Sequence, residues 1–149
     1  MKSVTAEPAV HDEVHAMLES YLDAVRRLDL KGITAYYAPD IVAYDAIAQL
    51  EFRGVEAYSA HWKMCLEHCQ SMLFEPREPK ILTSGDLAVG FYLVKCGGIG
   101  PDGKEHLGWM RATFAAQRRS GRWLIVHEHY SSPFDPMTNQ IMEGLEPQA

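Results

Sequence analysis

Tyr21 and Asp45 are the two residues whose types and positions point most directly to chemistry. A phenol can hydrogen-bond a developing oxyanion, while a carboxylate can abstract a proton next to a carbonyl. The apolar spacing over residues 10–28 predicts a helix with Tyr21 on its inner stripe. The segment IVAYD predicts a strand that carries Asp45 on the same face as Ile41 and Ala43. We therefore expect both side chains to point inward, as an oxyanion donor and a general base.

Plainer interpretations of both residues are open on sequence alone. Tyr21 could be a core residue whose hydroxyl bonds to nearby backbone. Asp45 could be a solvated residue at a turn. The catalytic interpretation requires both side chains to reach a common cavity, whereas the plainer interpretations do not.

The last two predicted strands mix polar and apolar residues. The period of two places Trp123, Ile125, His127 and His129 on one face of the final strand, with Glu128 on the other face. We take the first face as the concave one, so that Arg111 and His127 or His129 would project into the same cavity as Tyr21 and Asp45. Arg111 would then help Tyr21 to stabilise the oxyanion, and His127 or His129 would orient or shuttle the proton. Five residues are predicted to bind a ligand: Arg111, Trp62, Tyr37, Trp109 and Thr113. As alternatives, Arg111 could pair with Glu128 or another carboxylate across the sheet, and both histidines could be partly exposed.

Two groupings resemble metal ligands in spacing. They are His127-Glu128-His129 on one strand, and His61, Cys65, His68 and Cys69 at helical spacing. Zinc needs three or four converging ligands, and Cys65 and Cys69 also fit the apolar stripe of their helix. The expectation is therefore no metal and no cofactor. A nucleophilic serine turn and phosphate-binding glycine motifs are also missing from the sequence.

Composition narrows the range of partners. The 149 residues carry a formal net charge of −6 with both signs scattered, so a nucleic-acid surface is not expected. No apolar run approaches the roughly 18 residues of a membrane span. Three cysteines without CxxC spacing and an N-terminus without an apolar signal region favour a cytoplasmic protein.

The element order predicts an α+β fold. Helices are expected near 10–28, 30–38 and 55–69, a short hairpin at 41–45 and 50–53, and long antiparallel strands from residue 72 to residue 132. Such a sheet should be cone-shaped, curved and mixed but mostly antiparallel, wrapped around a pocket covered by the three helices. The expected organisation is a flexible tail at 1–8, one domain at 9–133 and a C-terminal tail at 134–149.

Over residues 10–133 the chain resembles the SnoaL-like, ketosteroid-isomerase-like branch of the nuclear transport factor 2-like superfamily. The resemblance lies in YLDAVRRLDLKGITAYYAPDIVAYD, in the helix after FRG, and in GWMRATFAAQRRSGRWLIVHEHYSSP. It implies a cone-shaped fold, often dimeric. It also matches Tyr21 to the isomerases' helix tyrosine and Asp45 to their general base. Their third group, a protonated carboxylic acid, has no equivalent, because WMRATF places Arg111 or Thr113 there.

The closing strands, with Arg111 and the run VHEHYSS, also resemble the association domain of calcium/calmodulin-dependent kinase II. Two functions therefore remain. One is an isomerase or lyase that moves a proton next to a carbonyl of a small molecule. The other is a non-catalytic binding or dimerisation module whose arginine-containing pocket holds a carboxylate. In either case we expect a homodimer.

Overall fold

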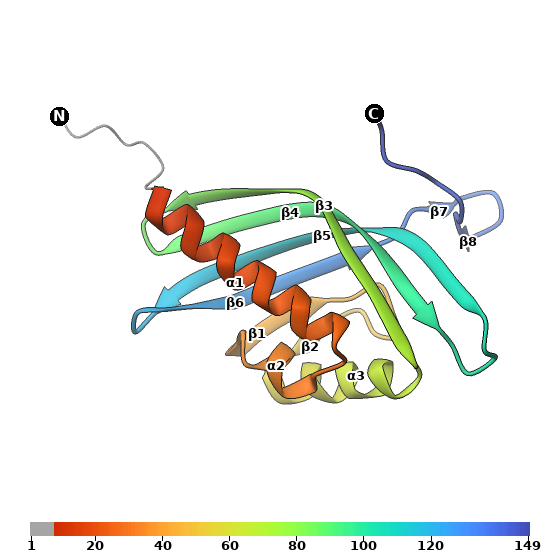
Figure 1. Cartoon of the computed structure of the whole chain (residues 1–149), viewed down its shortest axis with the longest axis horizontal. Helices are drawn as coiled ribbons and strands as arrows, with labels where there is room; N and C mark the ends of the chain where they lie inside the picture. Colours follow the sequence, from red (N-terminus) through yellow and green to blue (C-terminus); the bar gives the residue numbers. More distant parts are fainter. Residues whose placement is uncertain (1–7) are drawn as a thin grey trace.

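The computed structural model of the protein describes residues 8–149 (Figure 1). Most of the tail predicted at residues 1–8 lies outside this range. The elements, in chain order, are α1 (Pro8–Arg26), α2 (Leu30–Thr34), β1 (Tyr37–Tyr44), β2 (Phe52–Arg53), α3 (Val55–Glu67), β3 (Ser71–Ser84), β4 (Leu87–Ile99), β5 (Glu105–Arg119), β6 (Arg122–Ser131), β7 (Phe134–Asp135) and β8 (Gln140–Ile141). This order of three helices, a short hairpin and four long strands confirms the predicted α+β class.

The main sheet is an open, curved layer of six strands in the order β2-β1-β6-β5-β4-β3. β1 pairs with β6 in parallel, and every other neighbouring pair is antiparallel. The mixed, mostly antiparallel character expected from the sequence is therefore confirmed. The parallel pair matters for the site, because it brings the carboxyl end of β1 beside the carboxyl end of β6.

The helices cover one face of this sheet. In Figure 1, α1 crosses in front of the long strands, and α2 and α3 lie below them beside β1 and β2. The inward stripe of α1 includes Val14, Leu18, Tyr21 and Val25, all fully buried or nearly so. The predicted cap of α2 is present, because an Asp29 carboxylate oxygen accepts the Gly32 N–H at 3.0 Å. Helix α2 ends earlier than predicted, and β1 already begins at Tyr37.

A β-bulge in β6 changes which side chains face the helices. Ala115 pairs with His127 and Ala116 pairs with Ile125, so Val126 is an extra residue on β6. An extra residue interrupts the alternation of side chains between the two faces. The prediction that one concave face runs along the whole final strand is therefore wrong for the residues after Val126.

The buried residues show where the alternation changes. Trp123 and Ile125 are buried before the bulge, as predicted, but Glu128 and Tyr130 are the buried residues after it. His127 is half-buried and His129 is exposed. The inner face of β6 thus carries a carboxyl and a phenol where the sequence pattern predicted two imidazoles.

β3 is an edge strand that pairs only with β4 among the described strands. Its pairing shifts between Arg77 and Lys80, at the segment that contains Pro79. Proline lacks an N–H for the ladder and is tolerated at edges and bulges. β3 is consequently one long, irregular strand.

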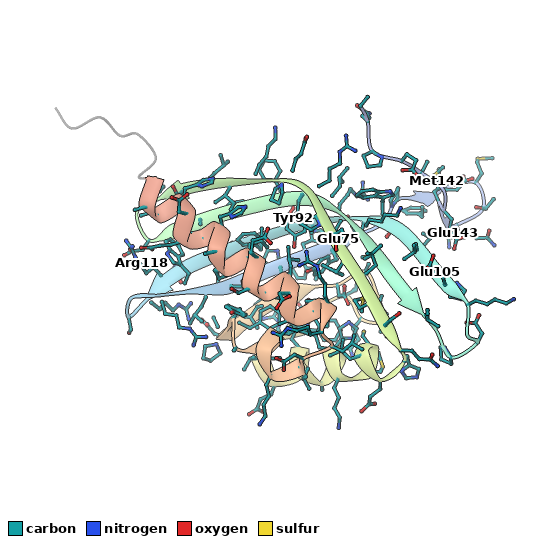
Figure 2. All side chains as sticks on the ribbon, viewed as in Figure 1. Glu75, Tyr92, Glu105, Arg118, Met142 and Glu143 are labelled. Atoms are coloured by element: carbon teal, nitrogen blue, oxygen red, sulfur yellow. The ribbon has the colours of Figure 1, made fainter. Side chains whose placement is uncertain are left out.

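The segment after β6 forms the small hairpin β7–β8 and then runs back over the sheet. Figure 2 shows Met142 and Glu143 beside Glu105, at the end of the molecule opposite Arg118. The Trp109 indole N–H donates to Glu146 at 3.2 Å, and Arg77 donates to the Gln148 carbonyl at 3.3 Å. None of the described helices is long and apolar enough to cross a membrane.

Candidate functional site

Glu128 lies at the centre of the space between the sheet and the helices, inside a cage of four phenols. Its Oε1 accepts hydrogen bonds from Tyr21 at 2.6 Å and Tyr130 at 3.1 Å. Its Oε2 accepts from Tyr37 at 2.7 Å and Tyr58 at 2.6 Å. These phenols come from α1, β1, α3 and β6, so the carboxyl ties four elements together.

The cage is closed by contacts among its own members. The Tyr21 hydroxyl lies 2.8 Å from the Tyr37 hydroxyl and 3.0 Å from that of Tyr130. The Trp62 indole N–H donates to the Tyr37 oxygen at 2.8 Å. All of these side chains are buried. Because the hydroxyls face one another and Glu128, the Tyr21 phenol does not open onto a cavity.

Burial controls the protonation of this cluster. Removal from water raises the pKa of Glu128, and this cost exceeds the opposing effect of the four phenolic hydrogen bonds. Burial, followed by the nearby Glu128 charge, raises the pKa of Tyr21, Tyr37 and Tyr130 well above that of free tyrosine. The tyrosines therefore stay neutral donors, and the carboxyl holds its proton more tightly than an exposed glutamate.

Glu128 was predicted on the opposite face of its strand, as a possible partner of Arg111. The structure instead places this carboxyl against Tyr21. The sequence comparison with the isomerases found no third acid near the matched tyrosine and aspartate. A buried carboxyl with a raised pKa does lie beside Tyr21, although it comes from β6 rather than from the WMRATF strand.

Asp45 lies directly after β1, next to His61 of α3. One Asp45 oxygen is hydrogen-bonded to His61 Nε2, and the other accepts the Ala46 N–H at 2.8 Å. The Asp45 side chain is 13% exposed and that of His61 is 3% exposed. Asp45 is thus a partly enclosed carboxylate with a fixed partner, and the interpretation as a solvated turn residue does not describe it.

Cys65 lies one helical turn after His61, and its sulfur is 3.7 Å from the same His61 nitrogen. Burial, and then the Asp45 charge, raises the pKa of the Cys65 thiol to about 11. Cys65 is therefore a thiol near neutral pH, not a thiolate nucleophile.

Two hollows open on either side of this cluster. One, of about 530 Å³, is lined by Asp45, His129 and the loop that follows β1. The other, of about 490 Å³, is lined mainly by apolar groups, including Cys65, Met64 and Met72. Ile47 lines both hollows. Asp45 therefore borders a recess of mixed polarity and Cys65 an apolar one, while His61 lines neither. A recess that joins a carboxylate to apolar groups suits a small organic molecule with one polar end.

Tyr58 connects the two clusters. Its hydroxyl donates to Glu128, and its ring is parallel to that of His61 with centroids 6.1 Å apart. Phe52 stacks on His61 with ring centroids 4.2 Å apart, and it also packs against Tyr58 at 5.5 Å. The imidazole is consequently held in one orientation, with Nε2 toward Asp45 and Cys65.

Arg111, Trp109 and Thr113 lie on the outer face of β5, whereas Ala112 and Phe114 point inward. Arg111 is exposed and donates to the Ser131 hydroxyl at 3.0 Å. It lines two hollows between the sheet and the C-terminal segment. The predicted convergence of Tyr21, Asp45 and Arg111 on one cavity is wrong, because the sheet separates Arg111 from the other two.

The remaining predicted residues divide between the two faces. Tyr37 and Trp62 belong to the phenol cage. His127 and His129 lie beside Tyr44 with ring centroids at 4.8 and 5.8 Å, and the His127 Nδ1 contacts the Val42 carbonyl oxygen at 2.7 Å. His129 shares the recess of Asp45, while His127 does not line it.

Sequence reasoning missed Glu128, Tyr58 and Tyr130 as site residues and assigned His61 no role beside Asp45. A glutamate that alternates with apolar residues near a strand end is a signal of a buried polar cluster. A carboxylate is rarely buried unless other groups bind it. Four tyrosines at inward positions were a second signal, since buried phenols need acceptors.

Comparison with known proteins agrees with this architecture. A family model described as a SnoaL-like domain matches residues 14–135. No curated protein gave a significant match to the sequence. An NTF2-like protein of unknown function from Pseudomonas putida KT2440 is 42% identical, with 95% of this chain and 99% of that chain covered and a TM-score of 0.88.

More distant structures share the fold alone. A proposed dehydratase of the NTF2-like family from Streptomyces avermitilis is 15% identical, with 88% and 100% of the two chains covered and a TM-score of 0.76. The association domain of Caenorhabditis elegans CaMKII is 17% identical, with 85% and 98% covered and a TM-score of 0.69. With the family model covering most of the domain, the chain belongs to the SnoaL-like family of the nuclear transport factor 2-like superfamily.

Proposed function

We propose that the protein is a small-molecule isomerase or lyase that transfers a proton next to a carbonyl, with Asp45 as the general base. The observation that carries the proposal is the Asp45–His61 pair, whose Asp45 lines a recess next to the apolar hollow that Cys65 lines. A carboxylate in this setting can take a proton from carbon, and the adjacent imidazole can return it. The apolar hollow would hold the hydrocarbon part of the substrate.

The other residues take supporting roles in this proposal. His129 lines the recess of Asp45 and can relay protons to solvent. Tyr58 positions His61 through ring contact, and Glu128 in turn holds Tyr58. Tyr21, Tyr37 and Trp62 act through that same network rather than on the substrate. The three free cysteines fit a reducing cytoplasm, where we place the protein.

The test uses proton exchange, which does not require the natural substrate. Small apolar ketones in D₂O are monitored by NMR for protein-dependent deuterium uptake at the α-carbon. For any ketone that exchanges, Asp45→Asn should lower the rate at least ~10²-fold, because one positioned base typically contributes ~10²–10⁴-fold. Asp40→Asn is the matched control: Asp40 is an exposed β1 residue that pairs with Arg119, and its substitution should leave the rate unchanged. Equal rates in the two variants would remove Asp45 from the mechanism.

A second candidate function is a non-catalytic module that binds an anionic ligand on the outer face, as part of a homodimer. It is favoured by the exposed Arg111 guanidinium, which lies between two hollows of about 530 and 600 Å³. Trp109 and Thr113 would line the same ligand, and an arginine fork suits a carboxylate. In a screen of small carboxylates, thermal stabilisation should disappear in Arg111→Ala. Equal stabilisation of that variant would contradict the module.

A further inference from the structure

Asp45, His61 and Cys65 each direct one possible ligand atom toward the same point. The three atoms lie within 4.8 Å of one another. We propose that these side chains form a binding site for a divalent transition-metal ion, with Zn²⁺ as the ion that the donor set fits best. The site goes beyond the proposed reaction and does not depend on it.

The separation of Cys65 from His61 agrees with tetrahedral coordination, and the direct Asp45–His61 hydrogen bond has to open for an ion to enter. Zinc bonds of about 2.0 Å to nitrogen and 2.3 Å to sulfur place two ligand atoms roughly 3.5 Å apart at a tetrahedral angle. The observed separation between Cys65 Sγ and His61 Nε2 is 3.7 Å. His61 and Cys65 are four residues apart on α3, so one helix face presents both, and Asp45 approaches from the end of β1.

The choice of atoms distinguishes this site from a nucleophilic cysteine. In a catalytic relay the acid holds one imidazole nitrogen while the nucleophile uses the other. Here Asp45 and Cys65 both approach Nε2 of His61. Such an arrangement does not form a relay, but it does place three donors around one position.

The surroundings fix two of the ligands in place. The His61 ring packs against Phe52 and Tyr58, which also pack against each other, and the Asp45 oxygen that does not contact His61 accepts the Ala46 N–H. Outer contacts of this kind orient metal ligands and raise affinity. Preorganisation reduces the ordering needed when the ion binds.

Charge and ligand type also select the ion. With the thiol deprotonated on binding, Asp45 and Cys65 would contribute two negative charges, which a divalent ion neutralises. Within residues 8–149, Asp45 is paired with His61 and forms no ion pair with a lysine or an arginine. Sulfur and imidazole donors favour zinc or cobalt over calcium or magnesium. Three protein ligands leave one coordination position open toward the adjacent hollows.

The site shares Asp45 and His61 with the proposed acid–base pair. A bound ion would occupy both groups, so metal binding and proton transfer by this pair exclude each other at any one moment. A metal-binding measurement therefore tests the inference without reference to turnover.

The experiment uses the full chain, stripped of metal with a chelator and kept reduced. Titration with Co²⁺ should saturate near one equivalent and produce a thiolate-to-cobalt charge-transfer band, and Zn²⁺ should displace the cobalt. Cys65→Ser should abolish the band, and Asp45→Asn should weaken Zn²⁺ binding at least ~10-fold. Cys69→Ser is the matched control, since Cys69 lies just after α3 and lines the same hollow; it should keep both the band and the affinity.

Each outcome decides the inference. Zn²⁺ binding well below one equivalent, or a band that persists in Cys65→Ser, would overturn it. Loss of the band in Cys69→Ser but not in Cys65→Ser would assign the metal to other ligands and overturn it equally. If the stripped protein exchanges ketone protons in an Asp45-dependent way but binds no metal, the metal site fails while the proposed reaction stands. If the protein binds metal but shows no Asp45-dependent exchange, the metal site stands and the proposed reaction fails.

Discussion

Glu128 shows how a carboxyl can be buried without a cationic partner among the described residues. Four phenols supply its hydrogen bonds, and their burial keeps them neutral. A fully bonded polar cluster of this kind fixes the relative positions of the elements that supply it. Here those elements are α1, β1, α3 and β6, so the cage also fixes where Tyr58 and His61 lie.

The raised pKa of Glu128 predicts a pH dependence of stability. Between the ordinary carboxyl pKa of 4.5 and the raised folded-state pKa, the native state binds more protons than the unfolded state. Stability contributed by this group must then fall as pH rises through that interval, and it is constant below it. The wild type should therefore lose stability relative to Glu128→Gln as pH rises above about 4.5.

Urea unfolding of both proteins from about pH 4 to about pH 8 provides the comparison. The difference between the two proteins isolates Glu128, because other titrating groups are common to both. A difference that does not change with pH, or that moves in favour of the wild type at higher pH, would show that burial does not raise this pKa.

The elements act on the site mainly through the bulge at Val126. Without the extra residue, strand periodicity would carry the inward face from Ile125 to His127 and His129. With it, Glu128 and Tyr130 face the helices, and the histidines turn toward Tyr44. The one extra residue therefore decides whether the helix-covered face of β6 carries imidazoles or a carboxyl.

Close contact between β4 and β5 gives a prediction at this scale. A Cβ added to Gly90 would lie 2.2 Å from the Phe114 ring, which packs over that position in the core. Gly90→Ala should lower the free energy of unfolding by about 1–3 kcal/mol, because the buried ring must shift.

Gly108, on the neighbouring strand β5, is the control for Gly90. A Cβ there meets no atom within 4 Å, so Gly108→Ala should change stability by less than about 0.5 kcal/mol. Urea denaturation of both variants measures the difference. Equal costs at the two positions would mean that Phe114 yields easily and that the packing argument is wrong.

The α+β class, the inward stripe of α1, the Asp29 cap and the β1–β2 hairpin were all predictable, because each rests on local periodicity or capping. The parallel pairing of β1 with β6 and the bulge at Val126 were not. Both depend on contacts between distant segments. That is why strand periodicity predicts the position of Asp45 but assigns Glu128 to the wrong face of β6, where the inward tyrosines are the remaining signal for it.

On the scale of the whole molecule, the sheet divides the candidate chemistry between two faces. Asp45 and His61 lie at the mouth of the helix-covered side, whereas Arg111 lies on the outer side under the C-terminal segment. A small ligand can engage one of these sites but cannot bridge both. Its position therefore distinguishes the proposed enzyme from the binding module.

A crystal structure of the protein with a ketone that undergoes exchange, or with a ligand retained through purification, tests this division most directly. The proposed reaction predicts a ligand in the hollows beside Asp45, with its α-carbon about 3–3.5 Å from an Asp45 carboxylate oxygen, as a near-attack geometry requires. A ligand seated instead against the Arg111 guanidinium, with the space beside Asp45 empty, would contradict it.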